Sequence, residues 1–130
     1  MATAGDGGQR ALIDGYVELR GRLAAMCELA RAGDWEPLLE AQADYQQSAK
    51  RLRELEASAR LDADGLARKR ELLEAILADD RELRQRMVAR RDELERLMAA
   101  SRRQRQMHRA YGRQAASGTG PAGGRETSEP

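Results

Sequence analysis

The sequence predicts an all-α protein, an antiparallel three-helix bundle with a short C-terminal fourth helix and disordered tails. The 130 residues are dominated by Ala, Leu, Arg and Glu, the composition of coiled coils and helical bundles. Apolar residues recur at steps of three and four over long segments, which places them on one helical face. No alternating Val, Ile or Thr run bounded by turns predicts a strand. The length suits one domain.

The first predicted helix spans residues 9–32, after a Gly-rich polar stretch, residues 1–8, that we expect to be disordered. Gly15 and Gly21 interrupt it, either because another helix approaches closely or as weak points. Gly33 is expected to end the helix in a left-handed conformation. The apolar seam steps by 4, 3, 4, 3 and 4 through Leu12, Tyr16, Leu19, Leu23, Met26 and Ala30.

The second predicted helix spans residues 35–60. Asp34 is placed to cap it, and Pro37 falls in the first turn, where its missing N–H costs nothing. The turn before it is so short that the first two helices should be antiparallel neighbours. Its apolar stripe consists of Leu38, Ala41, Tyr45, Ser48, Leu52, Leu55 and Ala59.

The third predicted helix spans residues 64–99, capped by Asp62 or Asp64. A helix with a single apolar stripe needs other helices to cover it. Ser101 is placed to cap a fourth helix over residues 102–111 that ends at Gly112, although the third helix could also run on through this segment. Residues 113–130 lack the apolar content to fold, so the bundle should occupy 9–112. The stripe of the third helix is Leu66, Leu73, Ile76, Leu83, Met87, Leu94 and Leu97, with polar breaks at Lys69, Asp80 and Arg90.

The charge balance and the chemistry-bearing residues exclude several classes of function. A formal net charge of +1 does not favour a nucleic-acid or membrane-surface binder. With one cysteine, Cys27, and one histidine, His108, the chain lacks a Cys/His metal set, and it has no phosphate-binding loop. We therefore expect no enzyme activity, metal or cofactor. The single cysteine and the missing signal peptide and membrane span predict a cytoplasmic protein.

The segment 101–113 carries five arginines and no acid. Such a segment favours an acidic partner or phosphates, or it is simply a basic helix end that complements the helix dipole. Tyr111 is an aromatic residue in a polar, near-terminal segment of a chain that has few aromatics. It should either dock on the bundle or contact a partner.

Residues from about Leu12 to Arg113 resemble the FliT family of flagellar export chaperones. The order and spacing of several short motifs carry this resemblance. They are Tyr16 and Leu19, the junction Gly33-Asp34-Trp35-Glu36 with Leu38, Leu39 and Tyr45, then Arg91-Asp92-Glu93-Leu94, and the closing Ala110-Tyr111-Gly112-Arg113.

The resemblance implies a small, helical, cytoplasmic chaperone that holds the unassembled filament-cap protein FliD for type III export. It also implies binding to the export-gate protein FlhA and the ATPase complex, with Tyr111 docking to the gate. For enteric members of the family, the resemblance also implies binding to the master regulator FlhDC, which restrains the activity of that regulator. In the family, the C-terminal helix is thought to cover the binding surface.

An apolar groove between helices can accept an amphipathic client segment as an added helix. We expect the groove to include five residues of the third helix, unless these are internal core: Leu73, Ile76, Leu77, Leu83 and Met87. Two other interpretations remain, a structural coiled-coil adaptor and a regulator acting through the basic segment 101–113. A homodimer through the first two helices is compatible with each of them.

Overall fold

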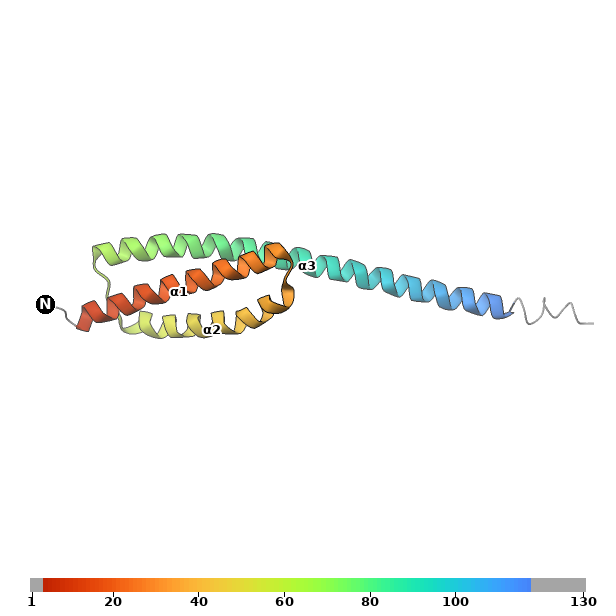
Figure 1. The fold of residues 1–130 in the computed structure, drawn as a ribbon, viewed down its shortest axis with the longest axis horizontal. Helices are drawn as coiled ribbons and strands as arrows, with labels where there is room; N and C mark the ends of the chain where they lie inside the picture. Colours follow the sequence, from red (N-terminus) through yellow and green to blue (C-terminus); the bar gives the residue numbers. More distant parts are fainter. Residues whose placement is uncertain (1–3, 118–130) are drawn as a thin grey trace, which may run out of the picture. The chain divides into compact units, whose positions relative to one another are not determined.

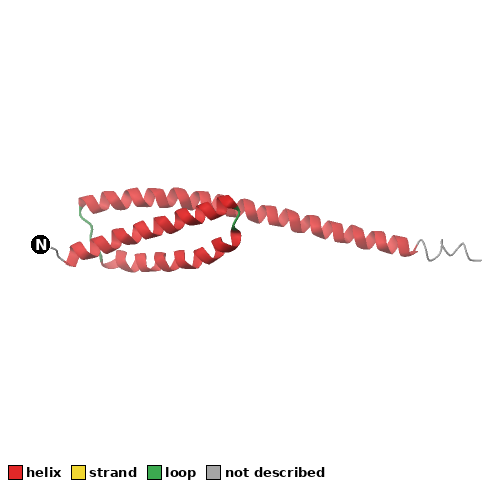
Figure 2. Cartoon of the chain, in the orientation of Figure 1, coloured by secondary structure: helices red, strands yellow, loops and turns green. Residues whose placement is uncertain are grey.

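The computed structural model describes residues 4–117, which form three helices joined by two short loops (Figures 1 and 2). They are α1 (Ala4–Ala32), α2 (Trp35–Ser58) and α3 (Ala63–Ser117). The chain divides into two units, Met1–Val88 and Ala89–Pro130. In the first unit, α1, α2 and the beginning of α3 lie side by side. The all-helical prediction is confirmed for the described residues.

The core of the first unit comes from all three helices and contains no Phe. Every residue of the predicted α1 seam is at most 6% exposed, and every member of the predicted α2 stripe is buried or half-buried. From α3 the core takes Leu72, Ile76 and Leu83. Trp35 packs against this core at the start of α2. The periodicity of three and four therefore identified the inner faces of α1 and α2.

The two glycines of α1 have different surroundings. A Cβ on Gly15 would lie 2.9 Å from Cδ1 of Leu52, so α2 approaches closely there. A Cβ on Gly21 would meet nothing within 4 Å. The close-approach interpretation thus holds for Gly15 but not for Gly21.

Both turns contain residues that the sequence indicated for ending or capping the helices. Gly33 adopts φ +76°, the left-handed conformation that glycine tolerates without strain. Asp34 occupies the N-cap position of α2, but its side chain makes no capping hydrogen bond. At the second turn, Asp62 is the cap, because its Oδ1 accepts a 2.8 Å bond from the Gly65 backbone N–H. Gln9 of α1 also bonds Asp62, accepting from its backbone N–H at 2.6 Å.

Four predicted boundaries differ from the structure, and one of them, the start of α3 at Ala63, differs by a single residue. α1 begins at Ala4, so residues 4–8 are helical rather than disordered, and residues 1–3 lie outside the described part. Residues 113–117 still belong to α3, while the rest of the predicted tail lies outside the described part. α2 ends at Ser58.

The separate fourth helix over 102–111 was a wrong prediction, because α3 is a continuous helix of 55 residues. Neither Gly nor Pro occurs between Gly65 and Gly112, so nothing in that stretch interrupts the backbone hydrogen bonds of a helix. Ser101 does not begin a new helix. Its Oγ accepts a 2.8 Å hydrogen bond from the Arg105 guanidinium one turn later.

The inner face of α3 is also rotated from the predicted stripe. Leu66 is 51% exposed, whereas Leu72, which the stripe omitted, is only 1% exposed. Because Leu72 and Leu73 are adjacent, either could continue a stripe toward Ile76, and the packing of α1 and α2 selects Leu72.

Among the described helices, none has the length and apolar character needed to cross a membrane.

Candidate protein-binding surfaces

The five predicted groove residues of α3 do not share one surface. Ile76 and Leu83 are each 6% exposed and belong to the bundle core, so in this conformation they are inaccessible to a client. Leu73 is half-buried against that core. Leu77 and Met87 are 58% and 36% exposed. The structure therefore separates a buried pair from three residues that a partner can reach.

Two of the accessible residues combine with Leu66 on the outer side of α3. Leu66, Leu73 and Leu77 line a shallow apolar depression, bordered by Lys69, Arg70 and Glu74. Their spacing of seven and then four residues keeps the three leucines on one helical face. We call this surface the outer patch (Leu66, Leu73 and Leu77). It was missed as a unit because the sequence placed Leu66 in the inner stripe.

A polar network behind the outer patch ties α3 to the other helices. Glu56 of α2 accepts hydrogen bonds of 2.5 Å from the Tyr16 hydroxyl of α1 and from the Lys69 ammonium of α3. Burial and the bond to Glu56 raise the pKa of Tyr16 well above its usual range. Burial alone would raise the pKa of Glu56, but the bonds from Lys69 and Tyr16 outweigh it and leave that pKa lowered. The network fixes the side of α3 that faces outward.

A second polar cluster joins α1 to α3 near the first turn. The Arg31 guanidinium donates two bonds of 2.6 Å to Glu82, which also accepts a 2.8 Å bond from Arg86. These bonds hold the pKa of Glu82 at about 2. The Cys27 thiol donates to the backbone carbonyl of Asp79 at 3.2 Å, and burial raises its pKa.

Potential ligand atoms of Cys27, Asp79 and Glu82 lie within 4.8 Å of one another, the usual first sign of a metal site. Here the Glu82 carboxylate already accepts hydrogen bonds from two arginines. The Cys27 thiol is buried and donates to the backbone carbonyl of Asp79. We therefore assign this cluster to helix packing.

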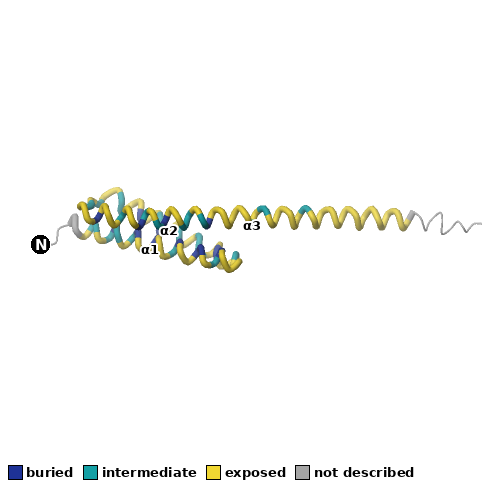
Figure 3. Tube along the Cα trace, turned by 90° about the horizontal axis from the view of Figure 1, so that it is seen from above, coloured by how far each residue is buried: buried dark blue, intermediate teal, exposed yellow. Residues whose placement is uncertain are grey.

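The second unit contains the rest of α3, which we call the distal segment (residues 89–117). Figure 3 colours most of it as exposed, and only Arg90, Asp92 and Ala99 are half-buried among its described side chains. The exposed set nevertheless includes large apolar side chains. They are Leu94, Leu97, Met98, Met107 and Tyr111, with exposed fractions from 41% to 77%.

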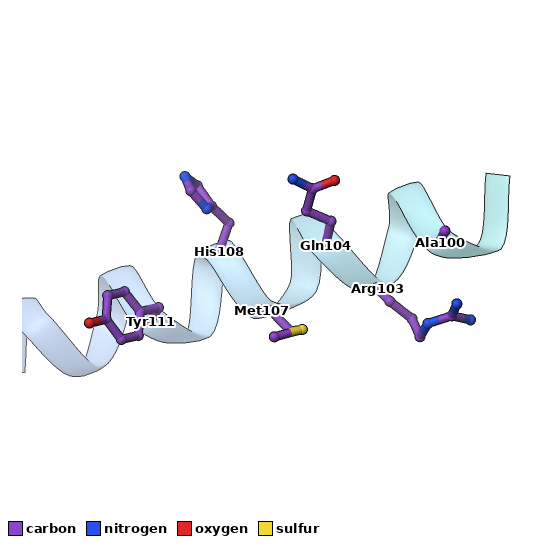
Figure 4. Close-up of a pocket in the computed structure, with 6 residues that line it drawn as sticks. All are labelled: Ala100, Arg103, Gln104, Met107, His108 and Tyr111. Atoms are coloured by element: carbon purple, nitrogen blue, oxygen red, sulfur yellow. The ribbon is translucent and has the colours of Figure 1, made fainter. Parts of the chain in front are cut away.

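Tyr111 lies in a shallow, mainly apolar depression along the distal segment, lined by Ala100, Arg103, Gln104, Met107, His108 and Tyr111 (Figure 4). Met107 and Tyr111 are one turn apart, so their side chains lie on neighbouring positions of one face. At 77% exposure, Tyr111 leaves most of its ring available to a partner. The sequence allowed either a buried or an exposed Tyr111, and in the structure its side chain is exposed.

A comparison with protein families identifies the chain's relatives. The family model described as "Flagellar protein FliT" matches residues 13–113. The chain belongs to the FliT family. This match covers all of α2 and the outer patch, and it ends just after Tyr111. No curated protein and no solved structure matches the chain.

Membership in the FliT family confirms the resemblance inferred from the motifs and makes this a flagellar protein. The match extends over both exposed apolar surfaces, the outer patch and the face of Tyr111. Neither surface carries a set of catalytic side chains in the described part of the chain. What these surfaces offer chemically is apolar contact area for another protein.

Proposed function

We propose that this FliT-family chain is a cytosolic export chaperone for the flagellar filament-cap protein. It binds an unassembled FliD-like client, prevents its premature assembly, and delivers it to the type III export apparatus. The observation that carries the proposal is the outer patch. After three helices have packed together, α3 still exposes Leu66 and Leu77 by more than half. Grouped apolar side chains on a folded surface favour a protein partner.

The outer patch suits an amphipathic client helix laid along α3. Such a helix presents apolar side chains at the same spacing of three and four residues. Each leucine that becomes fully buried contributes roughly 1.5–3 kcal/mol. Three such contacts contribute roughly 4.5–9 kcal/mol before the cost of docking, so the contacts around them must supply the rest of the binding free energy. Met87 extends the accessible apolar surface of the first unit.

Delivery requires a second contact, with the export apparatus. We assign this contact to Tyr111, which is highly exposed and has Met107 beside it on the same face. The partner would be an FlhA-like export gate, reached together with the ATPase complex. Aromatic side chains of this kind often dominate the energy of a protein interface.

The proposed partner set is wider than these two contacts. It comprises an FlhDC-like regulator, whose binding would restrain flagellar gene expression, and a homodimer through α1 and α2. The competing function, a structural coiled-coil adaptor, uses exposed apolar residues only to join copies of the chain. An adaptor would therefore capture no client.

Client binding is tested with a matched pair of variants. Leu77→Asp places a charge in the outer patch, and Leu39→Asp makes the same change on α2, where Leu39 is 64% exposed. Both residues are too exposed for the change to unfold the bundle. We expect Leu77→Asp to weaken binding of a purified FliD-like protein at least tenfold, measured by calorimetry, and Leu39→Asp to leave it unchanged.

Equal binding by both variants would remove the outer patch from the proposal. If the unaltered chain binds no FliD-like protein at all, the chaperone function itself fails and the adaptor is favoured.

Gate docking is tested at Tyr111. We expect Tyr111→Ala to weaken binding to the cytoplasmic domain of an FlhA-like protein at least tenfold, because it removes most of the exposed ring. Client affinity and the thermal midpoint should stay unchanged, since Tyr111 is not part of the bundle core. Gln104→Ala, in the same depression, is the matched control. Unaltered gate binding by Tyr111→Ala would contradict the assignment.

A further inference from the structure

A strongly basic stretch lies near the end of α3, and the proposed function does not use it. Residues 97–116 include five arginines and no acidic residue, and all five arginines are exposed. Within residues 4–117, no ion pair of α3 extends beyond Glu93. The formal net charge of +1 therefore averages this basic stretch with a remainder that is net negative. The charge of these arginines is available to an anionic partner.

Four of these arginines share one face of the helix. We call them the arginine stripe: Arg102, Arg105, Arg109 and Arg113. Their steps of three, four and four residues keep them within about 80° of the helix circumference and along about 16 Å of its axis. Between the first and the last of them, this face carries only Gln106 and Gly112 besides the arginines. The arginine stripe thus offers charge without any large apolar side chain.

The opposite face of the same segment is apolar. Met107 and Tyr111 lie about 160° around the helix from the centre of the arginine stripe. Their side chains are 71% and 77% exposed. A flat surface that contacts the arginine stripe therefore leaves Tyr111 free for its own proposed contact.

This arrangement indicates which kind of anionic partner fits. A protein interface has an apolar centre, and exposed ion pairs between single side chains add little without one. A helix bound in a groove of a nucleic acid has phosphates on both of its sides. Here four of the five arginines occupy one face and the opposite face is apolar. A flat anionic surface contacts a single face and presents many charges at once, so the arginines act together.

We propose that the arginine stripe binds the anionic lipid headgroups of a membrane surface. The helix lies along the surface without inserting, because Met107 and Tyr111 face away from it. Each arginine near such a surface raises the partition coefficient about fivefold, so four raise it roughly several hundredfold in low salt. Planar guanidinium groups also pair with phosphate oxygens in bidentate geometry. The proposal does not rest on the chaperone function, since neither the outer patch nor Tyr111 takes part.

Sedimentation of the full-length chain with lipid vesicles tests the proposal. We expect the chain to bind phosphatidylcholine vesicles that contain about 30% phosphatidylglycerol in about 0.1 M salt, and not to bind pure phosphatidylcholine vesicles. Salt at about 0.5 M should abolish binding, because the Debye length then falls to a few ångströms. Binding that persisted in this salt would overturn the proposal, because it would show that apolar side chains insert into the bilayer.

A matched pair of double variants tests the arginine stripe itself. Arg105→Gln with Arg109→Gln removes two of its charges and should weaken vesicle binding at least about tenfold. Arg20→Gln with Arg81→Gln makes the same change at two exposed arginines of the first unit and should alter binding by less than about twofold. Glutamine has high helix propensity, and circular dichroism verifies that each variant retains its helices. Equal losses in the two double variants would contradict the proposal, because only the overall charge would then matter.

Two further results would overturn the proposal. The first is a chain that does not sediment with the anionic vesicles in low salt. The second is tighter binding to a DNA duplex of about 20 base pairs than to those vesicles at equal phosphate concentration, which would assign the arginine stripe to nucleic acid. Neither result would affect the proposed chaperone function, which is measured with protein partners.

Discussion

The two parts of α3 have the same kind of sequence but different environments. In the first unit, Leu72, Ile76 and Leu83 are buried, whereas Leu94 and Leu97 of the distal segment are 41% and 57% exposed. The reason lies in helix length, since α3 has 55 residues and α1 and α2 have 29 and 24. An apolar stripe becomes core only where other helices are long enough to cover it. Beyond that point, it is available to partners.

The largest expected effect compares two leucines of the same helix. Leu72→Ala should lower the free energy of unfolding by about 2–5 kcal/mol, because Leu72 is 1% exposed and its removal leaves a cavity. Leu97→Ala should change it by no more than about 0.5 kcal/mol, since that side chain is largely in water. Urea denaturation followed by circular dichroism measures both values. Similar losses for the two variants would mean that the distal segment is packed.

A smaller effect distinguishes a glycine of the bundle from one of the distal segment. Gly15→Ala adds a methyl group 2.9 Å from Leu52 Cδ1, so crowding should outweigh the helix-propensity gain and lower stability by about 1 kcal/mol. Gly112→Ala meets nothing within 4 Å. It should raise the helical circular-dichroism signal without moving the unfolding midpoint. Gly21→Ala, equally uncrowded but inside the bundle, should raise that midpoint.

The smallest effect depends on pH. Bonds from Arg31 and Arg86 lower the pKa of Glu82 to about 2 from an ordinary 4.5. Its ionised form therefore stabilises the bundle above about pH 4.5, and this contribution is lost as the pH falls toward 2. Glu82→Gln should lower the thermal midpoint by a few degrees at pH 7, and the difference should shrink progressively as the pH falls to 2.

Glu95→Gln in the distal segment is the matched control and should shift the midpoint at neither pH. A Glu82→Gln difference that stayed constant down to pH 2 would show that shape or hydrogen bonding, rather than charge, carries the effect.

Sequence periodicity predicted those features of the fold that local chemistry determines. The seams of α1 and α2, the left-handed Gly33 and a cap at Asp62 or Asp64 each depend on a few neighbouring residues, and the structure selects Asp62. The rotation of α3 could not be predicted, because Leu72 and Leu73 both fit a helical stripe and only contact with the other helices chooses between them. Ile76 and Leu83 lay on the predicted stripe and Leu77 did not, yet the groove prediction grouped all three, because the pattern alone does not say which apolar residues become core.

The continuity of α3 through Ser101 was also undetermined by sequence. A serine can begin a helix, but good helix formers on both sides allow it to remain inside one. Tyr111 was singled out by its rarity in an aromatic-poor chain. Its exposure depends on tertiary structure, which no local pattern determines.

Cys27, the single cysteine of the chain, lies buried between α1 and α3, so its reactivity can measure transient separation of these helices. Alkylating reagents cannot reach Cys27 until α1 and α3 part, because this residue is 1% exposed and its thiol donates a hydrogen bond to the backbone carbonyl of Asp79. The rate of its modification therefore measures how often that seam opens, without any added label. Followed while a client or a second copy binds, this rate would report whether docking tightens or loosens the interior.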